Sequence, residues 1–197
     1  FDALHDSARG SLDARGWLAL MPALREPLLD HWLHARGMSA PTTAQRRQLE
    51  SQCGARAGRL PCVRWADVEL HIWKQRLWAL PTRKPMPDNW QQDWLGEPLR
   101  LPDGGELTLD KHGVRLAEPV RVYLRRGGER IKPAGDAHTR ELRDLFQQAQ
   151  LPPWQRNACP LLHLDDELVA VADRWASARG TAVFELAGAR PHWRPGR

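Results

Sequence analysis

Turn signals recur at short intervals through the second half of this 197-residue chain, and they leave room only for short elements. Three strong ones are Asp103-Gly104-Gly105, Arg126-Gly127-Gly128 and Asp165-Asp166, because Gly and Asp accept backbone angles that most residues avoid. The segments between turns are short apolar runs that predict strands. These runs lie at residues 107–109, 120–124, 161–164, 168–171 and 182–186.

One segment of this half has the spacing of a helix instead. Leu142, Leu145, Phe146 and Ala149 fall at i, i+3, i+4 and i+7, which predicts a helix over residues 138–149 with a core-facing apolar stripe. Asp136 is a candidate for its N-cap. Repeated short strands with one inserted helix suggest a small barrel, so residues 83–197 are expected to form a mostly β, barrel-like domain.

The first half predicts a small domain of helices and antiparallel sheet over residues 21–82. Apolar residues recur at helical spacing over 23–36, where Gly37 ends the helix, and a second helix is expected from Pro41 to about Cys53. Residues 63–80 alternate in the manner of strands, with a turn at Lys74-Gln75.

The remaining segments are expected to connect these domains. Residues 1–20 are expected to be a connector that precedes the first domain, and the proline-rich residues 81–87 a linker. The predicted fold class is therefore α+β.

Composition limits the kind of partner and compartment. The chain carries a net charge of +5, and 29 cations include only four lysines. Cys53, Cys62 and Cys159 lack C-x-x-C spacing, which argues against a disulfide framework and a structural zinc site. With no apolar run near the roughly 20 residues of a membrane span, a cytoplasmic protein without a membrane partner is expected.

A basic run is the best candidate for a functional site. Arg125, Arg126, Arg130 and Lys132 precede the predicted helix, which would start at His138-Thr139 and bring in further arginines. Cations beside a helix N-terminus suit phosphate oxygens. On these residues alone, a solvated hairpin and an ordinary polar helix face are the favoured explanation of the pattern.

The same region resembles a known family. The C-terminal domain of bacterial tRNA(Ile)-lysidine synthetases is similar to this chain at Gly127-Gly128-Glu129-Arg130-Ile131, His138-Thr139-Arg140, Leu142, Leu145-Phe146-Gln147, Pro152-Pro153-Trp154, Arg156 and Pro160-Leu161-Leu162. Glu141 departs from the pattern, since the family usually has lysine there. Less specific resemblance to the family's middle domain extends over 25–33, 41–49, 60–65 and 77–80.

The resemblance implies a closed six-stranded barrel and a tRNA-binding surface. Its expected tRNA contacts are Arg125, Arg126, Arg130, Lys132, His138, Thr139, Arg140, Arg143 and Arg156. A possible second tRNA surface comprises Arg46, Arg47, Arg59 and Arg64. No catalytic residue and no metal site is expected in this chain.

The resemblance also implies what the complete enzyme does. It would ligate free lysine to the wobble cytidine of the CAU anticodon of tRNA(Ile), using ATP and Mg²⁺ in an N-terminal PP-loop domain. The S-G-G-x-D-S loop of that domain does not occur in these 197 residues, so this chain is expected to be inactive alone and to hold no cofactor. A protein-interaction module with an incidental basic surface is the alternative.

Overall fold

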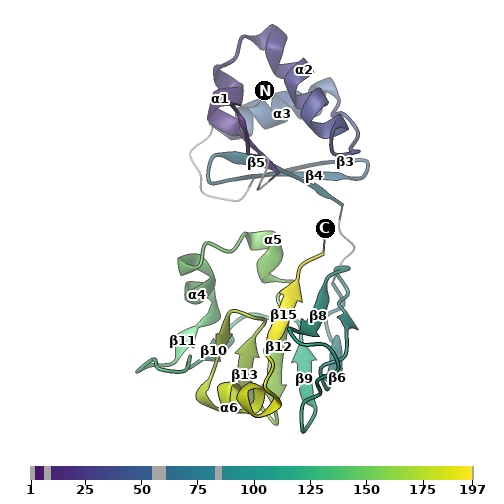
Figure 1. Ribbon diagram of the computed structural model, residues 1–197. Coiled ribbons are helices and arrows are strands. Elements are labelled where there is room, and N and C mark those ends of the chain that lie inside the picture. Colours follow the sequence, from purple (N-terminus) through teal and green to yellow (C-terminus); the bar gives the residue numbers. More distant parts are fainter. Residues whose placement is uncertain (1–2, 7–9, 55–60, 83–85, 197) are drawn as a thin grey trace. The chain divides into compact units, whose positions relative to one another are not determined.

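The computed structural model describes residues 3–6, 10–54, 61–82 and 86–196. The chain forms two compact units, residues 1–83 and 84–197, each with its own apolar core (Figure 1). Among the described residues, no helix combines the length and apolarity needed to cross a membrane.

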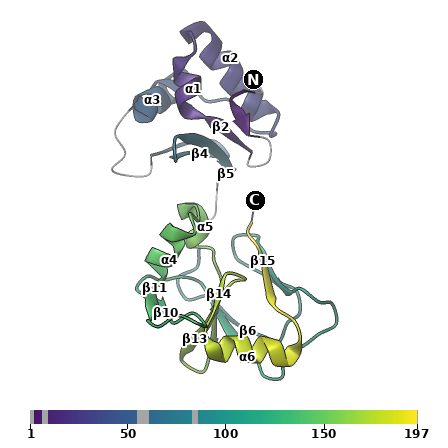
Figure 2. The ribbon, with the colours of Figure 1, turned by 60° about the vertical axis from the view of Figure 1, so that its left-hand side comes forward.

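The first unit packs helices on one face of an antiparallel sheet (Figures 1 and 2). The strand order is β1-β2-β5-β4-β3. The strands are β1 His5–Asp6, β2 Ser11–Asp13, β3 Cys62–Trp65, β4 Val68–Trp73 and β5 Arg76–Pro81. The helices are α1 Ala14–Ala19, α2 Pro22–His34 and α3 Thr43–Gly54.

The β4–β5 hairpin confirms its sequence prediction. Trp73 pairs with Arg76 across a two-residue turn in which Lys74 and Gln75 have φ of 50° and 60°. Positive φ at both positions is the type I′ geometry that matches the twist of a hairpin. Because side chains alternate along a strand, Val68 and Leu70 of β4 are buried on the face that packs against the helices. Glu69 and His71 of the same strand lie on the opposite face.

Residues 1–20 are not simply a connector, because the described part of this segment is built into the first unit. Leu12 pairs with Leu77 of β5 and is fully buried. Trp17 is 1% exposed, and its indole N–H donates to the Arg25 carbonyl at 2.9 Å. The Asp13 carboxylate caps α1. The side chains of Leu12 and Trp17 are therefore part of the core of the first unit. The turn signals of residues 1–20 do not reveal this.

The second unit contains a five-stranded sheet in the order β14-β13-β12-β9-β6, a three-stranded sheet β15-β8-β7 and the pair β10-β11. The strands are β6 Gln91–Trp94, β7 Leu99–Arg100, β8 Glu106–Leu109, β9 Val120–Tyr123, β10 Arg130–Ile131, β11 Arg140–Glu141, β12 Leu161–Leu164, β13 Glu167–Val171, β14 Trp175–Ala176 and β15 Pro191–Arg194. The helices are α4 Leu142–Gln148, α5 Pro153–Arg156 and α6 Ala178–Ala187.

The mixed helical and antiparallel architecture confirms the predicted α+β class. The closed barrel does not form: in the described part of the chain the sheets are open and separate. The second unit also has three helices there rather than one. Strands 161–164 and 168–171 lie where the sequence predicted them, as β12 and β13.

The predicted strand at 182–186 is wrong, since this segment belongs to α6. The Ser177 hydroxyl accepts the Gly180 N–H at 3.1 Å at one end, and Gly188 adopts φ of 64° at the other. Phe184 is the large side chain that α6 buries in the core. A short apolar run fits a strand or a helix equally well, so the caps and the packing decide.

The predicted helix at 138–149 begins later than expected. Residues 140–141 form β11, in which Arg140 pairs with Ile131 of β10, and the helix starts at Leu142. Its N-cap is Glu141, which makes no side-chain cap hydrogen bond, so Asp136 is not the cap. Pairing with β10 satisfies backbone groups that an earlier helix start would have used. The apolar stripe is core, apart from exposed Ala149.

Gly180 of α6 packs against Val169 of β13, so a substitution at Gly180 tests how closely the helix packs on the sheet. A Cβ built there would lie far inside contact distance of the Val169 carbonyl oxygen. Gly→Ala within a helix normally stabilises by up to about 1 kcal/mol. We expect Gly180→Ala instead to destabilise by about 1–3 kcal/mol, because α6 must move off the sheet. Urea unfolding of the 197-residue chain measures this change.

Ala182→Gly, at an exposed position of the same helix, is the control and should cost about 1 kcal/mol through propensity alone. A Gly180→Ala variant that is more stable than the parent would contradict the packing of α6 on β13.

Candidate nucleic-acid-binding surface

The Glu129 side chain shapes the turn that follows β9. Its Oε1 accepts the backbone N–H groups of Arg126 and Gly127, the latter at 2.6 Å. Gly127 and Gly128 have φ of 106° and 82°, which L side chains rarely adopt. The Glu129 carbonyl also accepts the N–H of Leu142, the first residue of α4, at 3.0 Å. One residue therefore ties the turn, β10 and α4 together.

Two of the predicted tRNA contacts use their guanidinium groups on the protein itself. Arg125 is 17% exposed, lies 5.4 Å from the centroid of the Phe146 ring, and has its Nε 3.5 Å from Glu129 Oε2. Arg156 Nε donates to the Leu151 carbonyl at 2.8 Å. Burial, with a smaller contribution from the Arg125 charge, lowers the pKa of Arg156. Both arginines help to hold the region around α4 in place.

Arg126, Arg130 and Lys132 are exposed: Arg126 lies in the turn, Arg130 in β10, and Lys132 directly after β10. Figure 1 shows β10 next to β11, which leads into α4. The β10–β11 register places Glu141 directly opposite Arg130, so the two side chains share one face. Arg140 shares the other face with buried Ile131. We call the three exposed cations the basic edge; they are the positions in this hairpin best placed for an external anion.

The predicted arrangement of cations around a helix N-terminus is not what the structure shows. His138 and Thr139 are exposed but precede β11 rather than open a helix. Arg140 is 32% exposed, with an Asp136 oxygen at 3.9 Å. Arg143 is 67% exposed and has the carboxylates of Glu141 and Asp144 within 4 Å. Acids at the start of α4 thus offset part of the positive charge.

A cavity of about 660 Å³ adjoins the turn. Arg125, Arg126 and Gly127 line it from the turn, and Asn89 and Asn157 contribute amide groups. Amide and guanidinium groups can hydrogen-bond sugar and base edges as well as phosphate. Sequence reasoning missed both asparagines, because residues so far apart in the chain give no local signal of meeting.

The possible second tRNA surface is only partly available. Arg46 is 16% exposed and donates to both oxygens of Asp30, at 2.6 and 2.7 Å, so it joins α3 to α2. Arg64 pairs with Glu69 at 2.9 Å but remains 67% exposed. Arg47 is exposed, and Arg59 lies outside the described residues. Of the three described arginines, Arg47 and Arg64 are therefore the ones exposed enough to meet an external anion.

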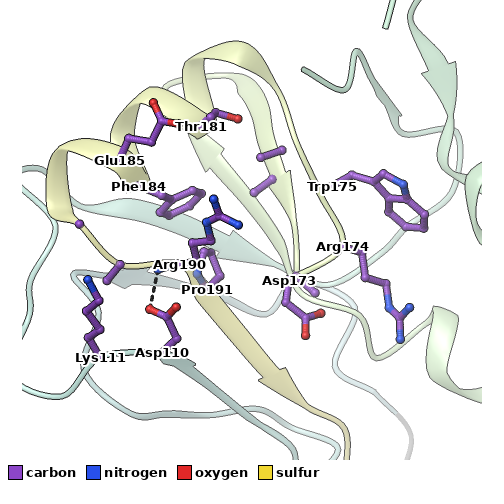
Figure 3. A pocket seen from close by; sticks show the side chains of 15 residues that line it. Asp110, Lys111, Asp173, Arg174, Trp175, Thr181, Phe184, Glu185, Arg190 and Pro191 are labelled. Carbon is purple, nitrogen blue, oxygen red and sulfur yellow. Dashed lines mark hydrogen bonds between the residues drawn. The ribbon is translucent and has the colours of Figure 1, made fainter. Parts of the chain in front are cut away.

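A second cavity, of about 540 Å³, lies between α6, strands β13, β14 and β15, and the residues that follow β8 (Figure 3). Phe184 and Pro191 contribute apolar surface, and the Asp110 carboxylate accepts the Arg190 N–H at 2.8 Å. The charged residues that line it balance: Lys111, Arg174 and Arg190 against Asp110, Asp173 and Glu185. It includes none of the predicted tRNA contacts and has no positive excess to attract phosphate.

The cysteines show no sign of nucleophilic chemistry. All three are free, and burial raises the pKa of each thiol, to about 12 for Cys53. A thiol whose pKa is raised stays protonated at neutral pH and is a poor nucleophile.

Comparison with known proteins assigns both units. The TilS substrate binding domain matches residues 12–78, and the TilS substrate C-terminal domain matches residues 120–193. A tRNA(Ile)-lysidine synthase of Xanthomonas campestris is 35% identical over 192 residues, covering 96% of this chain and 41% of its own length. That of Xylella fastidiosa is 36% identical over 177 residues, 86% of this chain and 40% of its own.

A solved TilS C-terminal domain is 20% identical and covers 45% of this chain and 79% of its own, with a TM-score of 0.32, too low to add to the assignment. The two sequence matches identify the units, in order, as a TilS substrate binding domain and a TilS substrate C-terminal domain. The chain belongs to the TilS, or tRNA(Ile)-lysidine synthase, family. It spans about two fifths of the length of the relatives it matches.

Arg46 and Arg47 are adjacent in the first unit, but only Arg46 is paired with Asp30, so mutating each in turn distinguishes a structural arginine from an exposed one. We expect Arg46→Ala to lower the free energy of unfolding by about 2 kcal/mol, because it removes charge-assisted hydrogen bonds to Asp30. Arg47→Ala removes the same charge from an exposed position and should change stability by less than about 0.5 kcal/mol. Chemical denaturation measures both, and equal effects would show that the Arg46 ion pair is not structural.

Proposed function

We propose that this chain is the tRNA-binding part of a tRNA(Ile)-lysidine synthase. The observation that carries the proposal is the matching of both units, in order, to the TilS substrate binding and C-terminal domains. The exposed cations of the basic edge support it, since phosphate contacts supply much of the affinity for nucleic acid. We also propose that the protein is cytoplasmic.

In the complete enzyme, we propose that ATP and Mg²⁺ act in a separate PP-loop domain. There the wobble cytidine of the CAU anticodon would be adenylated, and the ε-amino group of free lysine would displace AMP. Lysidine changes codon specificity from AUG to AUA. A catalytic pocket that sees one cytidine cannot distinguish tRNA(Ile) from other tRNAs with the same anticodon. Contacts far from that pocket, made by domains such as these, must therefore select the tRNA.

Within the second unit, the proposal divides the predicted residues into two groups. Arg126, Arg130 and Lys132, with His138, Thr139 and Arg143, are exposed and would contact tRNA directly. Arg125, Arg140 and Arg156 have partners within the protein and act by positioning the surface. Phosphate contacts fix the orientation of the tRNA but carry no sequence information themselves.

A test of the basic edge uses the triple variant Arg126→Ala, Arg130→Ala and Lys132→Ala. We expect tRNA binding to weaken by at least tenfold at low salt, because three phosphate contacts are lost. The slope of log affinity against log salt should become shallower by about one unit per contact. Fluorescence anisotropy with a tRNA(Ile) transcript at several salt concentrations measures both quantities.

The control is the triple variant Arg100→Ala, Lys111→Ala and Arg115→Ala, which removes the same charge from exposed positions of the same unit. Its salt slope should stay close to that of the parent chain. Equal weakening in both variants would show that net charge alone attracts the tRNA. Unchanged binding in the first variant would favour the alternative, a protein-interaction module with an incidental basic surface.

A further inference from the structure

Strands β3 and β4 bring together three side chains of the kinds that bind transition metals. Cys62 of β3 pairs directly with His71 of β4, and Arg64 pairs with Glu69. Directly opposed residues share one face of a sheet, and so do residues two apart on one strand. Cys62, Glu69 and His71 therefore lie on the face opposite the buried core residues Val63 and Leu70.

The distances between their donor atoms suit one small cation. Cys62 Sγ lies 3.8 Å from His71 Nε2, which lies 3.2 Å from Glu69 Oε2, and all three atoms fall within 4.8 Å of one another. Zinc bond lengths of about 2.3 Å to sulfur and about 2.1 Å to nitrogen or oxygen give tetrahedral edges of about 3.6 Å and 3.4 Å. Two of the three separations are close to these values without any movement of the backbone.

The surroundings of the three donors also suit a cation. The side chains of His71 and Glu69 are 12% and 10% exposed, so few waters compete for their donor atoms. Arg64 Nε donates to Glu69 Oε1 at 2.9 Å and leaves the other oxygen, Oε2, toward the histidine. A hydrogen bond to the second oxygen of a ligating carboxylate is the usual way in which proteins orient such a ligand.

We propose that Cys62, Glu69 and His71 form a zinc site in the first unit. Thiolate and imidazole donors favour Zn²⁺ over Mg²⁺ or Ca²⁺, which prefer oxygen ligands. Binding of the metal displaces to solvent the proton that the Cys62 thiol carries in its absence. Three protein ligands leave one tetrahedral position for water. The metal crosslinks β3 to β4 and stabilises the folded unit, because it binds that state in preference to the unfolded chain.

The experiment titrates Co²⁺, a spectroscopic substitute for Zn²⁺, into the metal-free, reduced 197-residue chain. We expect one equivalent to bind with a thiolate-to-cobalt charge-transfer band in the near ultraviolet, and one equivalent of Zn²⁺ to abolish that band. Cys62→Ser should remove the band, while Glu69→Gln and His71→Asn should each weaken binding by at least tenfold. Zn²⁺ should raise the thermal midpoint of the parent chain but not that of Cys62→Ser.

Cys53→Ser is the matched control, because Cys53 is also partly buried in the first unit but lies on α3, packs against the apolar core and is not part of the cluster. It should keep the full charge-transfer band. Circular dichroism checks that each variant is folded, and the Glu69→Gln variant, which preserves side-chain shape, provides a second test if Cys62→Ser is unfolded. Substoichiometric binding, a band that persists in folded Cys62→Ser, or a band lost in Cys53→Ser would overturn the proposal.

Discussion

The carboxylate of Glu129 holds the arrangement on which the candidate surface of the second unit depends. It accepts two N–H groups of the turn after β9 and pairs with Arg125, which in turn packs over Phe146 of α4. The charge of an acid at the centre of a basic segment, taken by itself, opposes anion binding. Here it fixes the glycine turn from which Arg126 projects, and so it reduces the conformational freedom that binding would otherwise have to remove.

The exposure of each cationic side chain, more than the total number of cations, determines how much positive charge this chain presents to an anionic partner. Arg46 joins two helices, and Arg125 and Arg156 hold the region of α4, so their charges serve the fold. The cations that remain exposed at the edge of the second unit are fewer than the sequence suggests. Arg126 lies in a turn held by hydrogen bonds, Arg130 lies in β10, and Lys132 directly follows that strand. This gives the surface a defined shape instead of a diffuse charge.

Sequence patterns predicted elements whose determinants are local. The alternation across Val68–Trp73 and the turn at Lys74-Gln75 predicted the β4–β5 hairpin, and apolar runs predicted β12 and β13. The patterns failed where distant partners decide the outcome. The segment at 182–186 is a helix because of its caps and its packing on Val169, and residues 140–141 are a strand because β10 pairs with them.

By itself the sequence determined the family, the positive charge and the mixed α+β class, because ordered motifs, composition and periodicity are properties of the chain alone. Only the tertiary structure decided which arginines are exposed and that the described sheets are open and do not close into a barrel. It also decided that Cys62, Glu69 and His71 meet on one face. The physical reason is that exposure and strand register depend on residues far apart in sequence. Pairing Cys62 with His71 places a thiol beside an imidazole, whereas a slip of one residue would send the two to opposite faces.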